Sequence, residues 1–227
     1  MKSLARTDDL AQFKSATMVF LGSLVPISGS VFYSVASDLT PVDHVFHRID
    51  ASHNVHYDAL FHRLDPFHPR RFHASGRPVV TVRDLPGRYH GSEYHHRFMS
   101  PLGLDFEAEL YLWQDGLMVG GISLHRSSAL SDFTAAELAQ LNSALPFIEH
   151  SFVTQRAFET ARQVEEWGLT KREREVLRLV RDGASNAEIG RRLQISVPTV
   201  KSHLQHVYDK SAIRSRLQLV ARLGGTG

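Results

Sequence analysis

The C-terminal part of the chain contains the stretch that decides its organisation, Leu169–Arg222, with the sequence LTKREREVLRLVRDGASNAEIGRRLQISVPTVKSHLQHVYDKSAIRSRLQLVAR. Apolar residues such as Val176 and Val180 recur in it at helical spacing. Thr170, followed three residues later by Glu173, has the pattern of a capping box that starts a helix. The stretch is therefore predicted to form four short helices, of which the middle two make a helix-turn-helix.

A short turn separates the second and third of these helices. The second helix is expected over Ala187–Leu193, where Gly190 costs about 1 kcal/mol relative to Ala and so indicates close packing of another helix. Residues 194–196 form the turn. Ser196 caps the third helix, and Pro198 lies in its first turn, where a missing N–H does no harm.

The third helix separates into an apolar face and a polar face. Lys and Gln on the polar face are side chains that can reach base edges in a DNA major groove. Val200, Leu204 and Val207 point inward, and the opposite face carries Lys201, Ser202, Gln205 and Asp209.

Charge supports a nucleic-acid surface. Residues from 170 onward hold 12 Lys and Arg against 5 Asp and Glu, a net charge of +7, whereas the rest of the chain carries −5. Such a basic module has the electrostatic footprint of a phosphate-binding surface. The alternative is a helical hairpin with a solvated basic face.

At these positions the chain resembles the LuxR-type helix-turn-helix family. The matching residues are Leu169, Thr170, Arg172, Glu173, Val176, Leu177, Gly183, Ser185, Asn186, Glu188, Ile189, Leu193, Ser196, Thr199, Val200, Lys201, His203, Lys210, Arg214 and Arg216. The resemblance implies an all-α four-helix domain whose third helix enters the major groove of double-stranded DNA and whose fourth helix pairs two protomers. It implies base-facing roles for Lys201, Ser202 and Gln205, and backbone contacts from Thr199, His203, Lys210 and Arg214, with Asn186 as a further DNA-binding candidate. Ser211 and Ala212 depart from the family, which usually has a large apolar residue and then Gly or Asn.

The length of 227 residues fits two domains. We expect a ligand-sensing domain over residues 1–150, a linker helix over 151–168 and the DNA-binding domain over 169–227. The absence of Cys excludes disulfides and Cys-based zinc sites and agrees with a cytoplasmic protein. No apolar run approaches the length of about 18 residues that spans a membrane, so no membrane partner is expected.

The N-terminal part alternates helices and strands in the order of an α/β sandwich. Its clearest hairpin alternates Phe106, Ala108, Leu110 and Leu112 with Glu107, Glu109, Tyr111 and Trp113. In the returning strand, Gly120 and Gly121 weaken pairing unless something packs or binds closely against the backbone. The predicted helices cover 4–24, 54–64 and one or two turns of 92–99, and the predicted strands cover 31–36, 42–49, 79–82, 106–113 and 117–125.

A long helix is expected to begin at the capping box of Thr134 and Glu137. Pro146 should kink this helix or split it in two. Its apolar residues form a heptad seam of Leu138, Leu141, Leu145, Ile148 and Phe152. We expect this seam to pack on a second protomer, because helix-turn-helix proteins commonly read two half-sites; packing on its own sheet is the alternative.

The order of elements resembles a GAF or PAS-like sensor domain, in which a small molecule lies between one sheet face and the helices over it. Pockets are mostly apolar with a few placed polar groups, and a buried tyrosine hydroxyl or indole N–H needs a partner. The candidate ligand-binding residues are therefore Tyr33, Tyr57, Phe61, Tyr94, Phe98, Tyr111 and Trp113. The alternatives are that these residues are plain core, and that the domain only dimerises or binds a protein partner.

Other classes of protein lack their motifs. A phosphorylated receiver domain needs an acidic pair, an Asp and a Lys after successive strands, and this set cannot be placed in the sequence. The Gly-x4-Gly-Lys-Ser/Thr loop of an ATP-binding regulator is absent. Trp113 and Trp167 do not stand in the Trp-x3-Tyr context of the acyl-homoserine-lactone sensors, which argues against a lactone inducer. No hydrolase or metalloprotease motif is found, so no enzyme is predicted.

Histidine is abundant in the N-terminal part. His53 and His56, with His47 or with His95 and His96, have a spacing that could ligate a metal or haem. No Cys assists and no acidic partner is evident in the sequence, so no metal or cofactor is predicted.

Overall fold

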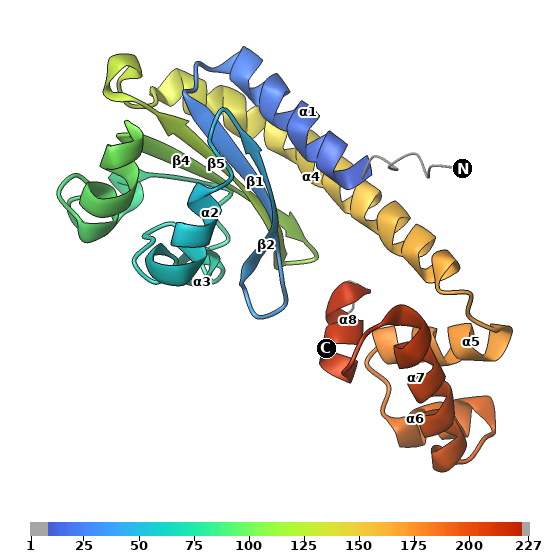
Figure 1. Cartoon of the computed structure of the whole chain (residues 1–227). Helices are drawn as coiled ribbons and strands as arrows, with labels where there is room; N and C mark the ends of the chain where they lie inside the picture. Colours follow the sequence, from blue (N-terminus) through green and yellow to red (C-terminus); the bar gives the residue numbers. More distant parts are fainter. Residues whose placement is uncertain (1–8, 224–227) are drawn as a thin grey trace, which may run out of the picture. The chain divides into compact units, whose positions relative to one another are not determined.

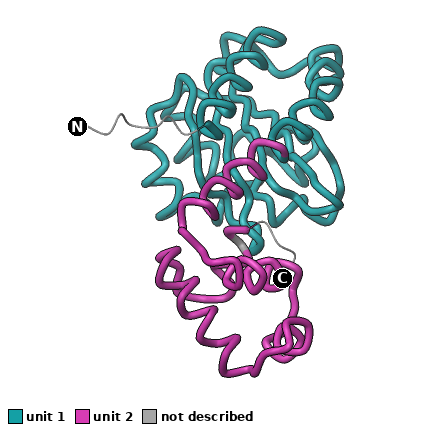
Figure 2. Tube along the Cα trace, turned by 90° about the vertical axis from the view of Figure 1, so that its right-hand side faces the viewer, with its two compact units in different colours: residues 1–153 teal, residues 154–227 magenta. Residues whose placement is uncertain are grey.

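The computed structural model describes residues 9–223, with the side chain of residue 221 left out. The chain divides into two compact units, Met1–Val153 and Thr154–Gly227, shown in different colours in Figure 2. The division falls inside the segment 151–168 in which a linker helix is expected. No helix among residues 9–223 combines the length and the apolar character needed to cross a membrane.

The first unit is built on one five-stranded antiparallel sheet with the strand order β2-β1-β5-β4-β3. The predicted hairpin of β4 and β5 is confirmed, and the strands expected over 31–36 and 42–49 form a second hairpin as β1 and β2. Strand β1 also pairs with β5, which joins the two hairpins into one sheet. The strands are β1 (Gly29–Val35), β2 (Pro41–His47), β3 (Val79–Thr81), β4 (Phe106–Gln114) and β5 (Leu117–Arg126).

Helices α1 (Asp9–Leu24) and α4 (Ala135–Glu166) cover one face of this sheet (Figure 1). The start of the first helix, predicted from residue 4, lies outside the described residues. The seam residues Leu141, Leu145, Ile148 and Phe152 are buried in a core with Leu110 and Ile122 of the sheet, and Leu138 packs at its edge. The prediction that this seam packs on a second protomer is therefore wrong, because the chain's own sheet already covers it.

The opposite face of the sheet is covered by short helical pieces instead of long helices (Figure 1). The helix expected over 54–64 is shorter, because it widens after His56 into a π-helical turn in which the His62 N–H bonds to the Tyr57 carbonyl. It ends where the N–H groups of Leu64 and Asp65 both bond to the carbonyl of Phe61. The pieces are α2 (His53–His56), η1 (Tyr57–Phe61), α3 (Pro69–Phe72), η2 (Val82–Asp84), η3 (His95–Met99) and η4 (Ser100–Leu102), with η5 (Ser128–Leu130) following β5.

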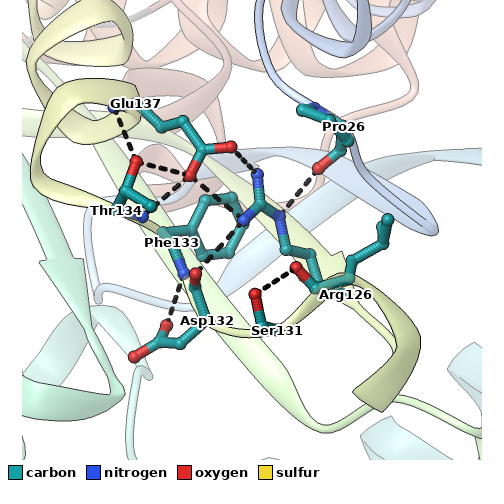
Figure 3. A network of polar contacts seen from close by, with 8 residues as sticks. Pro26, Arg126, Ser131, Asp132, Phe133, Thr134 and Glu137 are labelled. Carbon is teal, nitrogen blue, oxygen red and sulfur yellow. Dashed lines mark hydrogen bonds and ion pairs between the residues drawn. The ribbon is translucent and has the colours of Figure 1, made fainter.

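One network fastens the end of β5 to the start of α4 (Figure 3). The buried guanidinium of Arg126 lies 3.9 Å from the ring centroid of Phe133 and donates two hydrogen bonds to the Glu137 carboxylate, at 2.6 and 3.2 Å. The same carboxylate accepts from the backbone N–H of Thr134, which confirms the predicted capping box. Charge-assisted bonds of this bidentate kind are among the stronger ones in proteins. They fix where α4 begins.

Helix α4 runs through Pro146 as one helix, so the expected split does not occur. Pro146 itself is exposed, whereas Leu145 and Ile148 beside it are buried. Interior proline costs about 3 kcal/mol in a helix. Burial of several large apolar side chains on both sides of it, each contributing about 1.5–3 kcal/mol, offsets that cost.

The second unit contains the end of α4 and four further helices, which pack around their own core and confirm the all-α prediction. The capping boxes at Thr170 and Ser185 are both present, and Ser196 caps the third helix by accepting from the N–H of Thr199. Gly190 is tightly packed, since a Cβ there would lie 2.8 Å from the carbonyl oxygen of Ile195 in the turn. The helices are α5 (Lys171–Arg181), α6 (Asn186–Leu193), α7 (Val197–Ser211) and α8 (Arg216–Arg222).

Candidate functional site

The second unit presents α7 with one buried face and one open face. Val200, Leu204 and Val207 are buried, as expected for the inward face. Lys201, Ser202, Gln205 and Asp209 are exposed on the other face. The amide of Gln205 donates to the carboxylate of Asp209 at 2.9 Å, so Asp209 is held by its own helix. The open face therefore offers a cation and hydrogen-bonding groups of the kind that read base edges.

The other DNA-binding candidates surround this face, with different degrees of freedom. Thr199 is exposed in the first turn of α7, with its hydroxyl 2.7 Å from that of Ser196. His203 is half-buried, and its Nδ1 is enclosed without a hydrogen-bond partner among the described residues. Arg214 is exposed after α7, and the side chain of Asn186 accepts from Arg216 at 3.4 Å.

Lys210 is engaged inside the unit. Its ammonium donates to the buried carboxylate of Glu173 at 2.6 Å, which fastens the end of α7 to the start of α5. Together with the N–H and hydroxyl of Thr170, this hydrogen bond lowers the pKa of Glu173 to about 2. Lys210 is thus a packing residue of the helix-turn-helix as well as a candidate phosphate contact.

The first unit contains a cavity of about 70 Å³ between its sheet and the short helical pieces. Four of the predicted ligand-binding residues line it, namely Tyr33, Tyr57, Tyr94 and Phe98. The other three lie outside the lining. Phe61 stacks on Phe98 from behind at 4.8 Å, Tyr111 donates to the Phe67 carbonyl at 2.6 Å, and the backbone N–H of Trp113 donates to Glu149 at 2.9 Å.

Three buried carboxyl groups also line this cavity, and sequence reasoning missed all of them. Glu107 and Glu109 lie on the cavity face of β4 and Asp65 lies in the turn after η1. Alternation along a strand places residues two apart on the same face. The alternation predicted that Glu107 and Glu109 share a face with Tyr111, but not that the short helical pieces cover this face and bury the two carboxyl groups.

Tyrosine hydroxyls donate to these carboxylates. Tyr33 donates to Glu109 Oε1 at 2.5 Å and Tyr57 donates to Asp65 Oδ2 at 2.5 Å. Tyr89 lies at 3.4 Å from Glu107 Oε2. Each carboxylate of the cavity is therefore paired with a phenol. This pairing answers the expectation that buried tyrosines need partners.

Gly121 makes the position of Tyr33 possible. The two residues face each other in the β1–β5 pair, and a Cβ on Gly121 would lie 2.3 Å from the Tyr33 ring and hydroxyl. On the opposite sheet face, a Cβ on Gly120 would lie 2.8 Å from the Phe152 ring. The expectation that something packs closely against these two glycines is confirmed.

Burial shifts the titration of the cavity's groups. Desolvation raises the pKa of Glu109 to about 8, although the hydroxyl of Tyr33 opposes the shift. Desolvation also raises the pKa of Glu107 well above its usual range and that of Asp65 to about 6. The same cause lowers the pKa of His125, next to Glu107, to about 4. Glu107 and Glu109 thus hold protons at neutral pH, whereas Asp65 loses its proton near pH 6 and the imidazole of His125 is neutral.

The histidines of the unit do not gather into a metal site. Among residues 9–223, no three His, Cys, Asp or Glu side chains form a group that could hold a metal ion. His53 lines the cavity, whereas His56 is exposed.

Comparison with known proteins identifies the family. Residues 168–223 match the model of the bacterial regulatory proteins of the luxR family. The monoamine regulon transcriptional regulator of Klebsiella aerogenes is 32% identical over 207 residues, which cover 89% of this chain and 86% of that protein. The nitrate/nitrite response regulator protein NarL of Escherichia coli strain K12 is 37% identical over 90 residues, 40% of each chain.

Solved structures support the fold over the whole chain. The crystal structure of Escherichia coli SdiA has a TM-score of 0.58 at 18% identity, covering 99% of this chain and 91% of SdiA. A structure of SdiA in complex with octanoyl-rac-glycerol has a TM-score of 0.59 at 20% identity, covering 100% of this chain and 90% of that one. At this identity the likeness establishes the α/β fold of the first unit and the helical fold of the second.

The matched residues include the helix-turn-helix and its capping residues, and the likeness to the Klebsiella regulator extends through the first unit. Both findings concern transcription regulators and not enzymes. The chain belongs to the luxR family of bacterial regulatory proteins and is a DNA-binding transcriptional regulator.

Proposed function

We propose that this regulator binds a small molecule in the cavity of its first unit and that occupancy of the cavity controls operator binding by a homodimer. The observation that carries the proposal is the lining of the cavity. Glu109 Oε2 and His125 Nδ1 are enclosed there without a hydrogen-bond partner among the described residues. Polar atoms left unpaired in a core cost free energy, and a ligand would satisfy them.

Two relatives support a ligand-responsive regulator. The Klebsiella relative is named for a monoamine regulon, and SdiA has been crystallised with a small molecule. In this proposal the sensing domain covers residues 1–150, the helical linker 151–168 and the DNA-binding domain 169–227. Helix α4 runs from the first of these through the second, so it is the element by which a change at the cavity would reach the operator-binding helices.

In the DNA-binding domain, Lys201, Ser202 and Gln205 are proposed to read bases. Thr199, His203, Lys210, Arg214 and Asn186 are proposed to hold the phosphate backbone. Removal of one base-reading side chain costs about 1–3 kcal/mol of specific binding. Lys201→Ala and Gln205→Ala should each show such a loss in fluorescence-anisotropy titrations with an operator selected from a random duplex library. Unchanged affinity in both variants would refute the assigned face.

The second protomer is proposed to pack on the outer surface of the helical layer, since the inner seam of α4 is buried. Val19 and Phe20 of α1 and Phe147 of α4 are large apolar side chains exposed there. A second copy of the chain would cover them and supply the recognition helix for the second DNA half-site. Phe147→Glu should convert a dimer to monomers in native mass spectrometry, and a monomeric wild-type protein would contradict the arrangement.

The decisive experiment measures operator affinity against a small-molecule library. A compound that binds the cavity should shift operator affinity saturably, by about 5- to 150-fold for a typical coupling between sites. A regulator whose first unit only dimerises or binds a protein partner would remain empty in native mass spectrometry, and its operator affinity would not respond to any compound.

A further inference from the structure

The walls of the cavity carry three acidic side chains and no positive one. Asp65, Glu107 and Glu109 all line it, and the described lining residues include neither Lys nor Arg. Arg71 lies close enough to lower the pKa of Asp65, but it is exposed and donates to the Asp65 backbone carbonyl. Carboxyl groups that can ionise, with no Lys or Arg among the lining residues, favour a positively charged ligand over a negatively charged one.

The open hydrogen-bonding position at Glu109 is a carboxyl oxygen. The phenols of Tyr33 and Tyr57 already donate to Glu109 Oε1 and Asp65 Oδ2. Glu109 Oε2 accepts no hydrogen bond among residues 9–223, and the whole Glu109 residue is only 1% exposed. The Ser123 hydroxyl, opposite Glu109 in the β4–β5 pair, lies close enough to help lower the pKa of Glu109. An ammonium group has three N–H donors and no acceptor. It therefore matches what the cavity leaves unsatisfied.

Aromatic rings line the cavity opposite β4. Tyr57 and Tyr94 lie 5.8 and 5.6 Å from the ring of Phe98, centroid to centroid, and all three line the space. Ring faces attract cations and also bury alkyl or aryl groups. This wall suits the carbon skeleton of an amine whose charged end faces the sheet.

We propose, on the basis of the proposed function, that the ligand of this cavity is a small organic amine bound as its ammonium ion. The ammonium donates to Glu109 Oε2, with Glu107 as the second carboxyl group of the subsite, and the carbon skeleton packs on Phe98, Tyr57 and Tyr94. The cavity volume of about 70 Å³ favours a short skeleton, so n-butylamine should fit better than 2-phenylethylamine.

Titration supports the same assignment. Burial holds Glu109 protonated at neutral pH, with its pKa raised to about 8. A bound ammonium favours the carboxylate form, because an opposite charge at close range lowers a carboxyl pKa. Binding of a protonated amine at pH 7 should therefore release a proton from Glu109 to the solvent.

The test uses the full-length protein with n-butylamine and 2-phenylethylamine and their neutral and acidic analogues, 1-butanol, 2-phenylethanol and phenylacetate. Isothermal titration calorimetry should show that an amine binds at least about tenfold more tightly than its alcohol, which is the affinity that one hydrogen bond to a charged group contributes. Phenylacetate should not bind. Titrations in two buffers of different ionisation enthalpy should show the release of a proton.

Amino-acid substitutions distinguish a loss of amine binding from a loss of folding. Glu109→Gln keeps the shape and should weaken amine binding at least about tenfold while leaving alcohol binding unchanged. Glu107→Gln serves as a second variant should the first fold poorly by circular dichroism. Glu93→Gln, at an exposed carboxylate outside the cavity, is the matched control and should bind as wild type.

The outcomes distinguish the two proposals. Equal binding of an amine and its alcohol, or tighter binding of phenylacetate, would overturn the amine assignment and leave a small-molecule sensor in place. Failure of the folded wild-type protein to bind any amine of the series would also overturn it. The sensor proposal itself would fall only if, in addition, no compound of the wider library altered operator affinity.

Discussion

The phenol of Tyr33 donates a 2.5 Å hydrogen bond to Glu109, a residue 76 positions later in the chain. Two strands bring the groups together, since β1 and β4 both pair with β5. The bond is possible only because Gly121, between them on β5, has no side chain. One glycine therefore determines whether the buried carboxylate has its donor.

Gly121→Ala should displace the Tyr33 ring and destabilise the first unit by about 1–3 kcal/mol, the usual cost of overpacking a core. Urea unfolding measures the loss. The control is the same substitution in a Tyr33→Ala background, where the added methyl group has space and should cost much less. Equal losses of unfolding free energy in both backgrounds would show that contact with the Tyr33 ring is not the reason for a glycine at position 121.

Stability of the first unit should fall as the pH rises from about 5 to 8. The folded-state pKa of Glu109, about 8, lies above its unfolded value of 4.5, so the folded state binds the proton more tightly. The resulting stability is present below the unfolded pKa and is lost as the pH rises through 8, with a slope of up to about 1.4 kcal/mol per pH unit. Glu107 adds to the same trend.

Glu109→Gln removes this titration, so its unfolding free energy should change less between pH 6.5 and 8 than that of the wild type. His125, with its pKa lowered to about 4, and Asp65, at about 6, act mainly below this window. Trp113 fluorescence in a Trp167→Phe background reports unfolding of the first unit. Parallel profiles for the two proteins would contradict a buried, protonated Glu109.

Amine affinity should rise between pH 6 and 8. Ionised Glu109 is the binding form, and its fraction increases as the pH approaches about 8. The other acidic and imidazole groups lining the cavity are His44 on β2, His53 on α2, and Asp65, Glu107 and His125. Calorimetry at three pH values measures the trend, and Glu109→Gln should flatten it. Affinity that falls over this range would be inconsistent with an ammonium ligand held by Glu109.

Two lysines of α7 should behave differently on truncation. Lys210→Ala leaves the Glu173 carboxylate, which is buried, without its ammonium partner, so it should lower the stability of the second unit by about 1–3 kcal/mol. Lys201→Ala, at an exposed position, should change stability by less than about 0.5 kcal/mol while weakening operator binding. Thermal unfolding of the two variants side by side decides this. Similar melting temperatures would show that the Lys210–Glu173 pair contributes little.

Ala212→Gly should stabilise the second unit. Ala212 ends α7 in the left-handed conformation at a φ of 56°, which Gly adopts without the Cβ penalty. The gain should be about 0.5–1 kcal/mol, seen as a higher melting temperature. A neutral or negative change would mean that the Ala212 methyl group contributes packing at this position.

The sequence allowed the helix-turn-helix to be predicted almost residue by residue, because its signals are local. The caps at Thr170, Ser185 and Ser196 and the apolar periodicity of α7 each need only a few neighbouring residues. The hairpin of β4 and β5 was predictable for the same reason. Local patterns predict local structure well when tertiary contacts agree with them.

The cavity was harder to predict, because its residues meet only through the sheet. The aromatic candidates Tyr57, Tyr94 and Phe98 could be named from composition. Glu107 and Glu109 could not, since alternation along a strand does not reveal whether short helical pieces cover its polar face. The prediction for the apolar seam of α4 was wrong for a related reason, because a heptad pattern does not show which surface will bury the seam.

Helix α4 has a further consequence for the way the molecule responds to damage. Its residues up to Phe152 are anchored in one core, but none of residues 153–166, all within the described part, is buried. The two cores share no buried residue, so the chain has two centres of cooperativity. A substitution that unfolds the first unit can leave the DNA-binding helices folded. In the proposed function, loss of ligand control and loss of operator binding are therefore separable effects of substitution.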